Sequence, residues 1–188
     1  MDHKGLMTEA ARLATESVEN GWGGPFGAVI VKDGEIVARG QNRVLLTGDP
    51  TAHAEVECIR KASQLLNPYS PSIAPEEQNE ATLTLVPRPP DSPDIVPERA
   101  HMLMGYSLYT AGIPCPMCMS AIYWSRISAV YFSCDLDATK SIGFDDAFQY
   151  EDFSRPLDER TIPVTQVHPE LGEQAYAAWN HKPDHHPY

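Results

Sequence analysis

Residues 26–39, FGAVIVKDGEIVAR, decide the fold of this chain. They contain two runs of apolar and β-branched residues separated by Asp33-Gly34, a dipeptide that favours a two-residue hairpin turn. Two antiparallel strands are therefore expected, one on each side of the turn. In front of them, residues 4–19 carry apolar side chains at helical spacing, which predicts an amphipathic helix.

Helices and strands alternate after this hairpin. Asp49-Pro50 supplies an N-cap and a proline at the first helical position, so a second helix is expected from about residue 50 to residue 66. The later strands are expected at 106–111, 129–133 and 161–167, and the later helices at 114–124 and 169–180, with a polar stretch at 137–153. This order predicts an α/β fold, a three-layer α/β/α sandwich with a mixed sheet.

One stretch interrupts this pattern. Residues 67–99 hold eight of the 17 prolines and no glycine, with six acidic residues against two arginines. Such a segment cannot bury enough apolar surface to offset the entropy lost on ordering. We therefore expect a single domain, residues 1–188, that carries an exposed proline-rich insertion at about 67–100.

The charge balance restricts the partners of the chain. Its 14 Lys and Arg residues against 26 Asp and Glu residues give a formal net charge of −12, which repels phosphate backbones. No apolar run approaches the roughly 20 residues of a membrane span, and the first residues lack the pattern of a secretory signal. The sequence therefore predicts an intracellular, cytoplasmic chain that binds neither nucleic acid nor a membrane.

The residues that carry chemistry lie at the predicted starts of two helices. Residues 53–55 are His-Ala-Glu in the first turn of one, and residues 114–118, Pro-Cys-Pro-Met-Cys, open another. Cys115 and Cys118 are three residues apart, so they share a helix face and can bind one ion. The imidazole of His53 completes a set of three ligands that suits zinc and leaves a fourth position open.

Glu55 is the candidate for proton transfer beside that open position. The pattern H-x-E…P-C-x-x-C is that of zinc-dependent nucleobase deaminases. Two alternatives stay open. A redox dithiol explains Cys115 and Cys118 but not the first motif, and a closed structural zinc site needs a fourth ligand, for which Cys58 or Cys134 is available.

Several further stretches carry a resemblance to a known family. They are GGPFGAVIV (23–31), Asn42, DPTAHAEV (49–56), IYW (122–124), GFDD (143–146) and ERTIP (159–163). Together with the zinc motifs they closely resemble bacterial-type guanine deaminases of the cytidine-deaminase-like superfamily, over residues 5–66 and 103–188. The resemblance implies hydrolysis of guanine to xanthine and ammonia. It also implies a homodimer whose C-terminal segments, at about 168–188, are swapped so that each closes the partner's pocket.

The resemblance implies a role for each matched residue. The matched residues comprise zinc ligands, a proton carrier, and residues that hold or cover the purine. The implied zinc ligands are His53, Cys115 and Cys118, and the implied proton carrier is Glu55. The residues that hold or cover the purine are Asn42, Asp146, Phe26, Trp124 and Tyr188. Within the last group, Asn42 and Asp146 bind the purine and Phe26 packs against its ring. The other two cover the pocket from the partner chain.

Chemistry independent of the resemblance supports Asp146. Guanine presents two adjacent donors, the ring N1–H and the exocyclic amine, and an ionised carboxylate can accept from both. Cytosine and adenine pair a donor with an acceptor on that edge, so the same carboxylate selects against them. Simpler roles stay open: a solvated acidic loop for Asp146, a strand aromatic for Phe26, a turn for Asn42, and a core or interface position for Trp124.

Guanine deamination, as implied by the resemblance, is the leading hypothesis. The alternatives are a deaminase of the same fold that acts on another aminated heterocycle or on a nucleoside such as guanosine, and a non-enzymatic zinc or redox protein. Deamination of adenosine in transfer RNA is disfavoured by the net charge of −12, because RNA sites usually need a basic surface.

Overall fold

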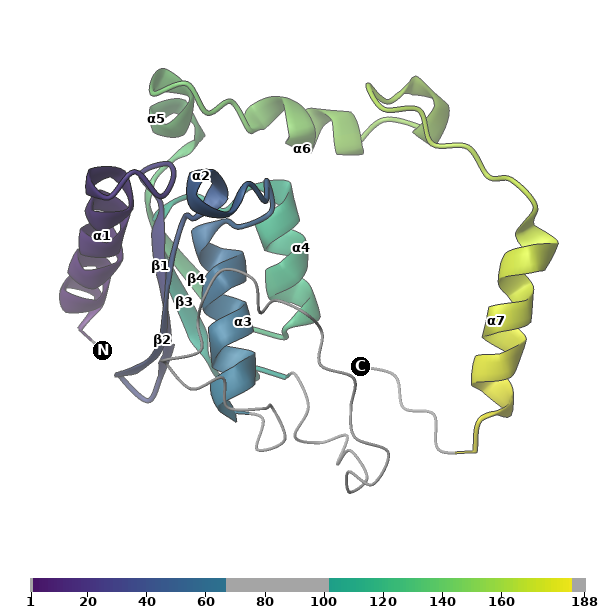
Figure 1. Cartoon of the computed structure of the whole chain (residues 1–188), viewed down its shortest axis with the longest axis horizontal. Coiled ribbons are helices and arrows are strands. Elements are labelled where there is room, and N and C mark those ends of the chain that lie inside the picture. The colour runs from purple at the N-terminus through teal and green to yellow at the C-terminus, as the bar shows by residue number, and fades with distance from the viewer. Residues whose placement is uncertain (1, 67–101, 184–188) are drawn as a thin grey trace.

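The predicted hairpin forms part of the central sheet (Figure 1). β1 (Gly27–Lys32) pairs antiparallel with β2 (Glu35–Gln41), and the turn residues Asp33 and Gly34 have φ values of 51° and 88°. Two successive positive φ values are those of a type I′ turn, whose twist matches the strands that it joins. The computed structural model describes residues 2–66 and 102–183, so the predicted insertion and Tyr188 lie outside the described residues.

The described strands form one mixed sheet in the order β2-β1-β3-β4. β3 (Ser107–Gly112) runs antiparallel to β1, and β4 (Ala129–Cys134) runs parallel to β3. A parallel pair needs a crossover connection, which α4 (Pro116–Trp124) supplies. The predicted α/β class with a mixed sheet is therefore confirmed.

Helices cover both faces of this sheet (Figure 1). α1 (His3–Glu19) lies on one face, and α3 (Ala54–Leu66) lies with α4 on the other. Because side chains alternate along a strand, β1 sends Val29 and Val31 to the cluster under α1, and Ala28 and Ile30 to the cluster under α3. All four side chains are fully buried, so the layers are those predicted from the sequence.

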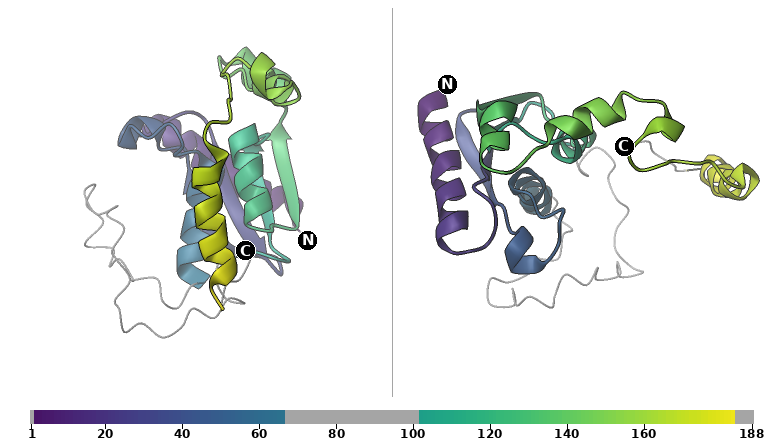
Figure 2. Two further views of the ribbon diagram at one scale, coloured as in Figure 1. Left: turned by 90° about the vertical axis from the view of Figure 1, so that its right-hand side faces the viewer. Right: turned by 90° about the horizontal axis from the view of Figure 1, so that it is seen from above.

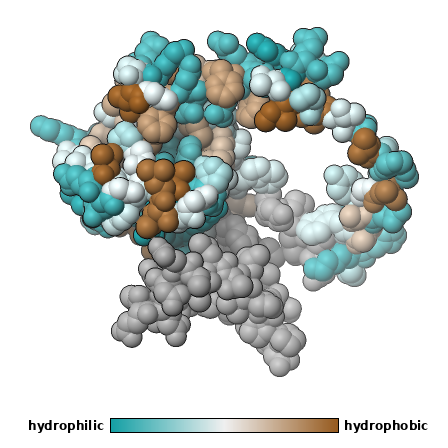
Figure 3. Space-filling view, turned by 45° about the horizontal axis from the view of Figure 1, so that its top comes forward, coloured by the Kyte–Doolittle hydropathy of each residue, from teal (hydrophilic) through white to brown (hydrophobic). Residues whose placement is uncertain are grey.

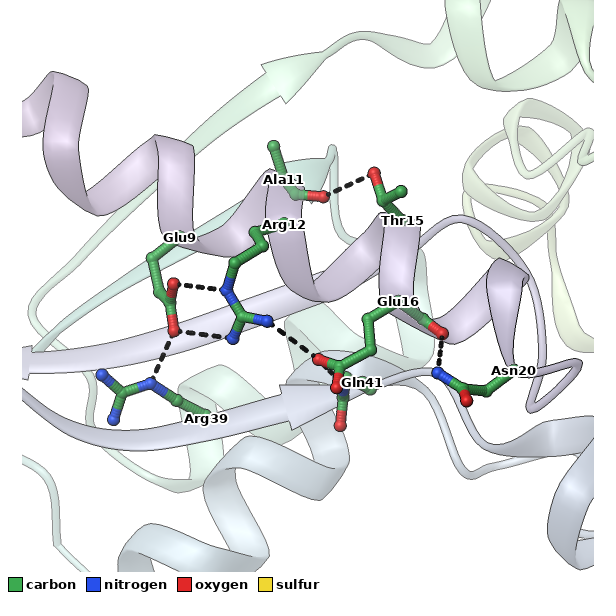
Figure 4. A network of polar contacts seen from close by, with 8 residues as sticks. All are labelled: Glu9, Ala11, Arg12, Thr15, Glu16, Asn20, Arg39 and Gln41. Atoms are coloured by element: carbon green, nitrogen blue, oxygen red, sulfur yellow. Dashed lines mark hydrogen bonds and ion pairs between the residues drawn. The ribbon is translucent and has the colours of Figure 1, made fainter.

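A polar network joins α1 to β2, an edge strand of the described sheet (Figure 4). The Glu9 carboxylate accepts hydrogen bonds from Arg12 on its own helix and from Nε of Arg39 on β2, at 2.7 Å in the second case. Gln41 Nε2 donates to Glu16 at 2.7 Å. The hydrogen bond from Arg12, together with that from Arg39, lowers the pKa of Glu9 to about 2, so this carboxylate is ionised at neutral pH.

Two expectations about local structure are wrong. α3 begins at Ala54 rather than near residue 50, because the Asp49 carboxylate accepts hydrogen bonds from the backbone N–H and the hydroxyl of Thr51 and closes a turn there. His53 therefore precedes the helix instead of lying in its first turn. Residues 161–167 are not a strand: Ile162 is 76% exposed, and no described strand pairs with this segment.

The remaining predicted elements agree with the structure within two residues at each end. The structure adds short helices that the sequence patterns do not indicate. They are α2 (Val44–Thr47), α5 (Leu136–Ser141) and α6 (Ala147–Phe153), the last two within or overlapping the polar stretch 137–153. None of the described helices is both long and apolar enough to cross a membrane.

The chain leaves the body of the molecule after α6. Residues 154–183, which we call the C-terminal arm, contain η3 (Leu157–Glu159) and α7 (Pro169–His181). In Figure 1 and in the right-hand view of Figure 2, α7 stands apart from the sheet. Apolar side chains lie at the surface along the arm (Figure 3); Val167, Leu171 and Tyr176 are each more than 60% exposed.

Two glycines let the helices approach the sheet closely. A Cβ atom at Gly27 would overlap backbone atoms of Ala10 and Ala14 on α1, and one at Gly40 would overlap backbone atoms of Ala54 and Cys58 on α3. Backbone atoms of a packed helix cannot move aside individually. Each helix therefore rests on the sheet at a point where a side chain is excluded.

We expect Gly40→Ala to lower the free energy of unfolding by about 1–3 kcal/mol, because the added methyl group must displace α3 from the sheet. The matched control is Gly5→Ala at the start of α1, where the new Cβ would meet only the flexible carboxylate of Asp2. Its effect should stay within about 1 kcal/mol. Urea denaturation of both variants checks this, and equal stabilities would contradict the close approach at Gly40.

Candidate metal centre and substrate pocket

A pocket of about 330 Å³ lies where β2 ends and where α3, α4 and α6 begin. This volume is at the small end of ligand pockets, which run from about 300 to 1,000 Å³. The pocket wall contains most of the residues that the sequence predicts for the site: Phe26, Asn42, His53, Glu55, Cys115 and Asp146.

Local structure orients the metal-binding side chains. The carbonyl of His53 accepts the first hydrogen bond of α3, from Glu57 N–H at 2.9 Å, so His53 stands at the helix start. Cys115 is the N-cap of α4, and its carbonyl accepts from Met119 N–H at 2.9 Å. Cys118 follows in the first turn of the same helix. The positive end of the α4 dipole and its free amides stabilise negative charge on these two sulfur atoms.

The three side chains converge with distances that fit zinc. His53 Nδ1 lies 3.6 Å from Cys115 Sγ and 3.5 Å from Cys118 Sγ. Zinc bonds of about 2.3 Å to sulfur and about 2.0–2.1 Å to nitrogen, set at a tetrahedral angle, separate the two ligand atoms by about 3.6 Å. The donor set of one imidazole and two thiolates also matches the preference of zinc. His53, Cys115 and Cys118 therefore form a zinc-binding site.

The other two cysteines do not complete a four-ligand site. Cys58 is fully buried on the core-facing side of α3, and Cys134 is exposed at the end of β4. Within residues 2–66 and 102–183, the cluster of metal-binding side chains contains His53, Cys115 and Cys118 alone. Three protein ligands leave one tetrahedral position for water or substrate, which is the arrangement of a catalytic zinc site.

The electrostatics favour a thiolate at Cys115. The hydrogen bond from the Cys118 thiol, and next the contact with His53, lower the pKa of Cys115 to about 4. The pKa of Cys118 is raised, chiefly by its hydrogen bond to Cys115 and by burial. The pKa of His53 is raised by its hydrogen bond to Cys115. One sulfur is therefore ready to bind a cation without losing a proton first.

Glu55 lies in the first turn of α3 and is 4% exposed. Burial raises the pKa of its carboxyl group to about 7, and negative charge on Cys115 adds to this effect, whereas His53 opposes it. A carboxyl group that titrates near neutral pH can both accept and release a proton under physiological conditions. Glu55 lies in the pocket wall together with the zinc ligands His53 and Cys115.

Asn42 follows β2 and is 4% exposed. Its side-chain Oδ1 accepts hydrogen bonds from the backbone N–H groups of Gly24 and Val44, each at 3.2 Å. Asn42 therefore shapes a turn, as the simpler alternative for this residue holds. Asn42 also lines the pocket, and because two donors identify Oδ1 as the acceptor, its Nδ2 group is a hydrogen-bond donor.

The neighbouring carboxylates Asp145 and Asp146 have different environments. Asp145 forms an exposed ion pair with Lys140 at 2.8 Å, as expected for a solvated acidic loop. Asp146 is the N-cap of α6 and lies in the pocket wall, where burial raises the pKa of its carboxyl group. Phe26 lies nearby in the same wall and meets the edge of Phe144, with 5.1 Å between ring centroids.

Two predicted residues lie elsewhere. Trp124 is at the last position of α4, at the opposite end of that helix from Cys115, and it is 64% exposed. It does not line the pocket of its own chain. Tyr188 lies outside the described residues. Sequence reasoning missed Phe144 and Leu45 in the pocket wall, although Phe144 stands in the segment 143–146 that carries the resemblance.

Comparisons with known proteins place these features in a family. Residues 1–134 match the family described as the cytidine and deoxycytidylate deaminase zinc-binding region. The chain is 42% identical over 167 residues to the guanine deaminase of Bacillus subtilis, which covers 89% of this chain and 86% of that protein. It is 34% identical over 128 residues to a tRNA-specific adenosine deaminase of Aquifex aeolicus, covering 68% of this chain and 63% of that one.

Similarity to a solved structure extends over the whole chain. The X-ray structure of guanine deaminase from Bacillus subtilis superposes with a TM-score of 0.79 at 39% sequence identity, covering 100% of this chain and 99% of that chain. The guanine deaminase structure from Nitrosomonas europaea has a TM-score of 0.55 at 23% identity and covers 75% of this chain and 63% of that chain. At this lower identity the similarity shows the fold alone.

We expect Cys118→Ser to reduce the zinc content to well below the single ion per chain of the parent protein, because it removes one of three protein ligands. The matched control is Cys134→Ser, which removes an exposed sulfur at the end of β4 and should leave zinc content unchanged. Elemental analysis of the purified proteins measures both. Zinc loss in Cys134→Ser would make that residue a fourth ligand and contradict an open site.

Proposed function

The chain belongs to the cytidine and deoxycytidylate deaminase zinc-binding family, and within it to the guanine deaminases, and on this basis we propose that it hydrolyses guanine to xanthine and ammonia. The observation that carries the proposal is the convergence of His53, Cys115 and Cys118 next to the buried Glu55 at one small pocket. Hydrolytic removal of an amine is accelerated by a metal that activates water and by a group that carries protons, and this pocket offers ligands for the first and a carboxyl group for the second.

The reaction forms a bond between C2 of the purine and a water oxygen, and breaks the bond from C2 to the amine. Zinc held by His53, Cys115 and Cys118 would supply Lewis acidity that activates a water molecule for this attack. Glu55 takes a proton from the attacking water and delivers it to ring N3. The proton of the hydroxyl group now on C2 then passes through Glu55 to the amine, which leaves as ammonia while C2 becomes a carbonyl. A pKa of about 7 suits Glu55 to both halves of this transfer.

Three side chains on the pocket wall recognise the purine in this proposal. The Asp146 carboxylate accepts hydrogen bonds from the ring N1–H and the amine of guanine, which are adjacent donors. The Asn42 Nδ2 group donates to a ring acceptor, since its Oδ1 is held by Gly24 and Val44. Phe26, fixed by its edge contact with Phe144, packs against the ring.

Similarity to a known enzyme supports a free base over a nucleoside. The guanine deaminase of Bacillus subtilis is 42% identical to this chain over 89% of its length, and guanine is a free base. The net charge of −12 argues against an RNA substrate, even though tRNA-specific adenosine deaminases are among the relatives. Guanine is therefore preferred over guanosine and over transfer RNA.

The test is ammonia and xanthine formation from guanine by the zinc-loaded protein, compared with Glu55→Gln. We expect the variant to keep its zinc and to lose about 10²- to 10⁴-fold in kcat, the usual contribution of a general acid–base group. Glu57→Gln is the matched control, because Glu57 lies on the same helix and pairs with Arg60 at 2.7 Å, away from the pocket wall. An active Glu55→Gln variant would remove Glu55 from the mechanism, and a parent protein inactive on guanine would refute the substrate.

We further propose that two copies of the chain exchange their C-terminal arms. The arm presents apolar side chains that cover no part of the described body, and β4 carries Tyr131 and Phe132, 37% and 46% exposed, at the edge of the described sheet. In such a dimer each arm buries its apolar side chains on the partner. Trp124 and Tyr188 then cover the partner's pocket, consistent with the distance of Trp124 from its own pocket.

A complementation experiment tests this exchange. We expect a chain truncated after residue 167 and a full-length Glu55→Gln chain each to be inactive alone. Co-expressed with different tags and purified together, they should recover roughly half of the parent activity, because one of two sites combines an intact Glu55 with an intact arm. No recovery in the purified mixed dimer would show that each arm acts on its own chain.

We also propose that residues 1–188 form a single deaminase domain interrupted by the proline-rich insertion at about 67–100, and that the protein acts in the cytoplasm.

A further inference from the structure

One turn of α6 joins the substrate pocket to the segment that carries a zinc ligand. Asp146 is the N-cap of this helix, and Tyr150 lies four residues later, on the same side of the helix. The Tyr150 hydroxyl donates a hydrogen bond of 2.6 Å to the carbonyl oxygen of Pro114. This carbonyl belongs to the peptide bond between Pro114 and the zinc ligand Cys115.

The surroundings of Tyr150 make this hydrogen bond directional. Its ring lines a second hollow of about 380 Å³, whose other lining residues, Ile113, Pro114, Met119 and Leu136 among them, are apolar. Pro114 is fully buried. Burial also raises the pKa of Tyr150, so its hydroxyl keeps the proton that it donates. Tyr150 is 37% exposed, and its hydroxyl group is directed at the Pro114 carbonyl.

Contacts on two sides of the pocket hold the segment around Asp146, in addition to the exposed ion pair of Asp145 with Lys140. On one side, the ring of Phe144 meets Phe26 at the start of β1, an aromatic contact that leaves some freedom of rotation. On the other side, the hydrogen bond from Tyr150 to Pro114 specifies a direction and a distance. Other polar contacts of α6, such as those of Asp152 with Thr161, stay within the segment or lead to the arm.

We propose that Tyr150 is a positioning residue, whose hydrogen bond to Pro114 sets the place of the Asp146 carboxylate relative to the zinc-binding Cys115. The proposal rests on the recognition of the purine by Asp146. Tyr150 touches neither the metal nor the purine, and it acts through the backbone of α6. Loss of its hydroxyl should leave the ring in the apolar hollow and free α6 to shift, which misplaces Asp146 and weakens its grip on guanine.

The experiment combines Tyr150→Phe, Asp146→Asn and the double variant, each loaded with zinc and assayed on guanine. We expect Tyr150→Phe to keep its zinc and its thermal midpoint and to lose roughly tenfold in kcat/KM, mainly through a higher KM. Because both residues act on one interaction, the double variant should be no more impaired than Asp146→Asn alone. The matched control is Tyr123→Phe, a 72% exposed tyrosine on α4, which should leave kinetics unchanged.

Each other outcome decides against the proposal in a recognisable way. Unchanged KM and kcat in Tyr150→Phe beside an impaired Asp146→Asn would overturn the positioning role alone. Loss of zinc or of folded protein in Tyr150→Phe would make Tyr150 a residue of general stability. Additive losses in the double variant would show that Tyr150 acts independently of Asp146. An unimpaired Asp146→Asn variant would overturn both the recognition of guanine by Asp146 and the inference built on it.

Discussion

A single metal ion shared by His53, Cys115 and Cys118 is the constraint on which the rest of the structure depends. His53 is 62 residues away in sequence from Cys115, so the fold must bring the starts of α3 and α4 together. It does so because β2 and β3 are both antiparallel to β1, so that their C-terminal ends lie at the same end of the sheet. Each strand leads to one of the two helices, and Gly40 lets α3 lie close enough for their starts to meet.

The sequence could predict the parts of this arrangement that local signals determine. The hairpin at Asp33-Gly34, the first helix and both zinc motifs follow from turn residues, apolar spacing and ligand spacing, and the structure agrees with them. These signals did not predict where α3 begins, because an aspartate such as Asp49 is favoured both at a helix N-cap and in a turn. In the structure its carboxylate accepts a hydrogen bond from Thr51 N–H and closes a turn. Local patterns predicted the helix at 169–180 but wrongly predicted a strand at 161–167, a segment that pairs with no described strand and in which Ile162 is 76% exposed.

The site residues show the same division. Ligand spacing identified the metal cluster, and the family resemblance, supported by chemical complementarity to guanine, indicated Asp146. The adjacent Asp145 has the same side chain but a different environment. The difference arises from the helix that begins after Asp146 and from the ion pair that holds Asp145 outside the pocket. The family resemblance implied that Trp124 covers a pocket. Because Trp124 lies at the end of α4, it does not line the pocket of its own chain.

The last strand of the described sheet affects the tendency of the newly made chain to aggregate. β4 has the sequence AVYFSC, which contains no charge and no proline, and its outer edge has no partner strand among the described residues. Natural proteins commonly protect such edges with charged residues, prolines or bulges, because a bare edge adds any extended peptide that it meets. A newly made chain is therefore prone to aggregate until this edge is covered. The yield of native protein on refolding should therefore fall as the protein concentration during refolding rises.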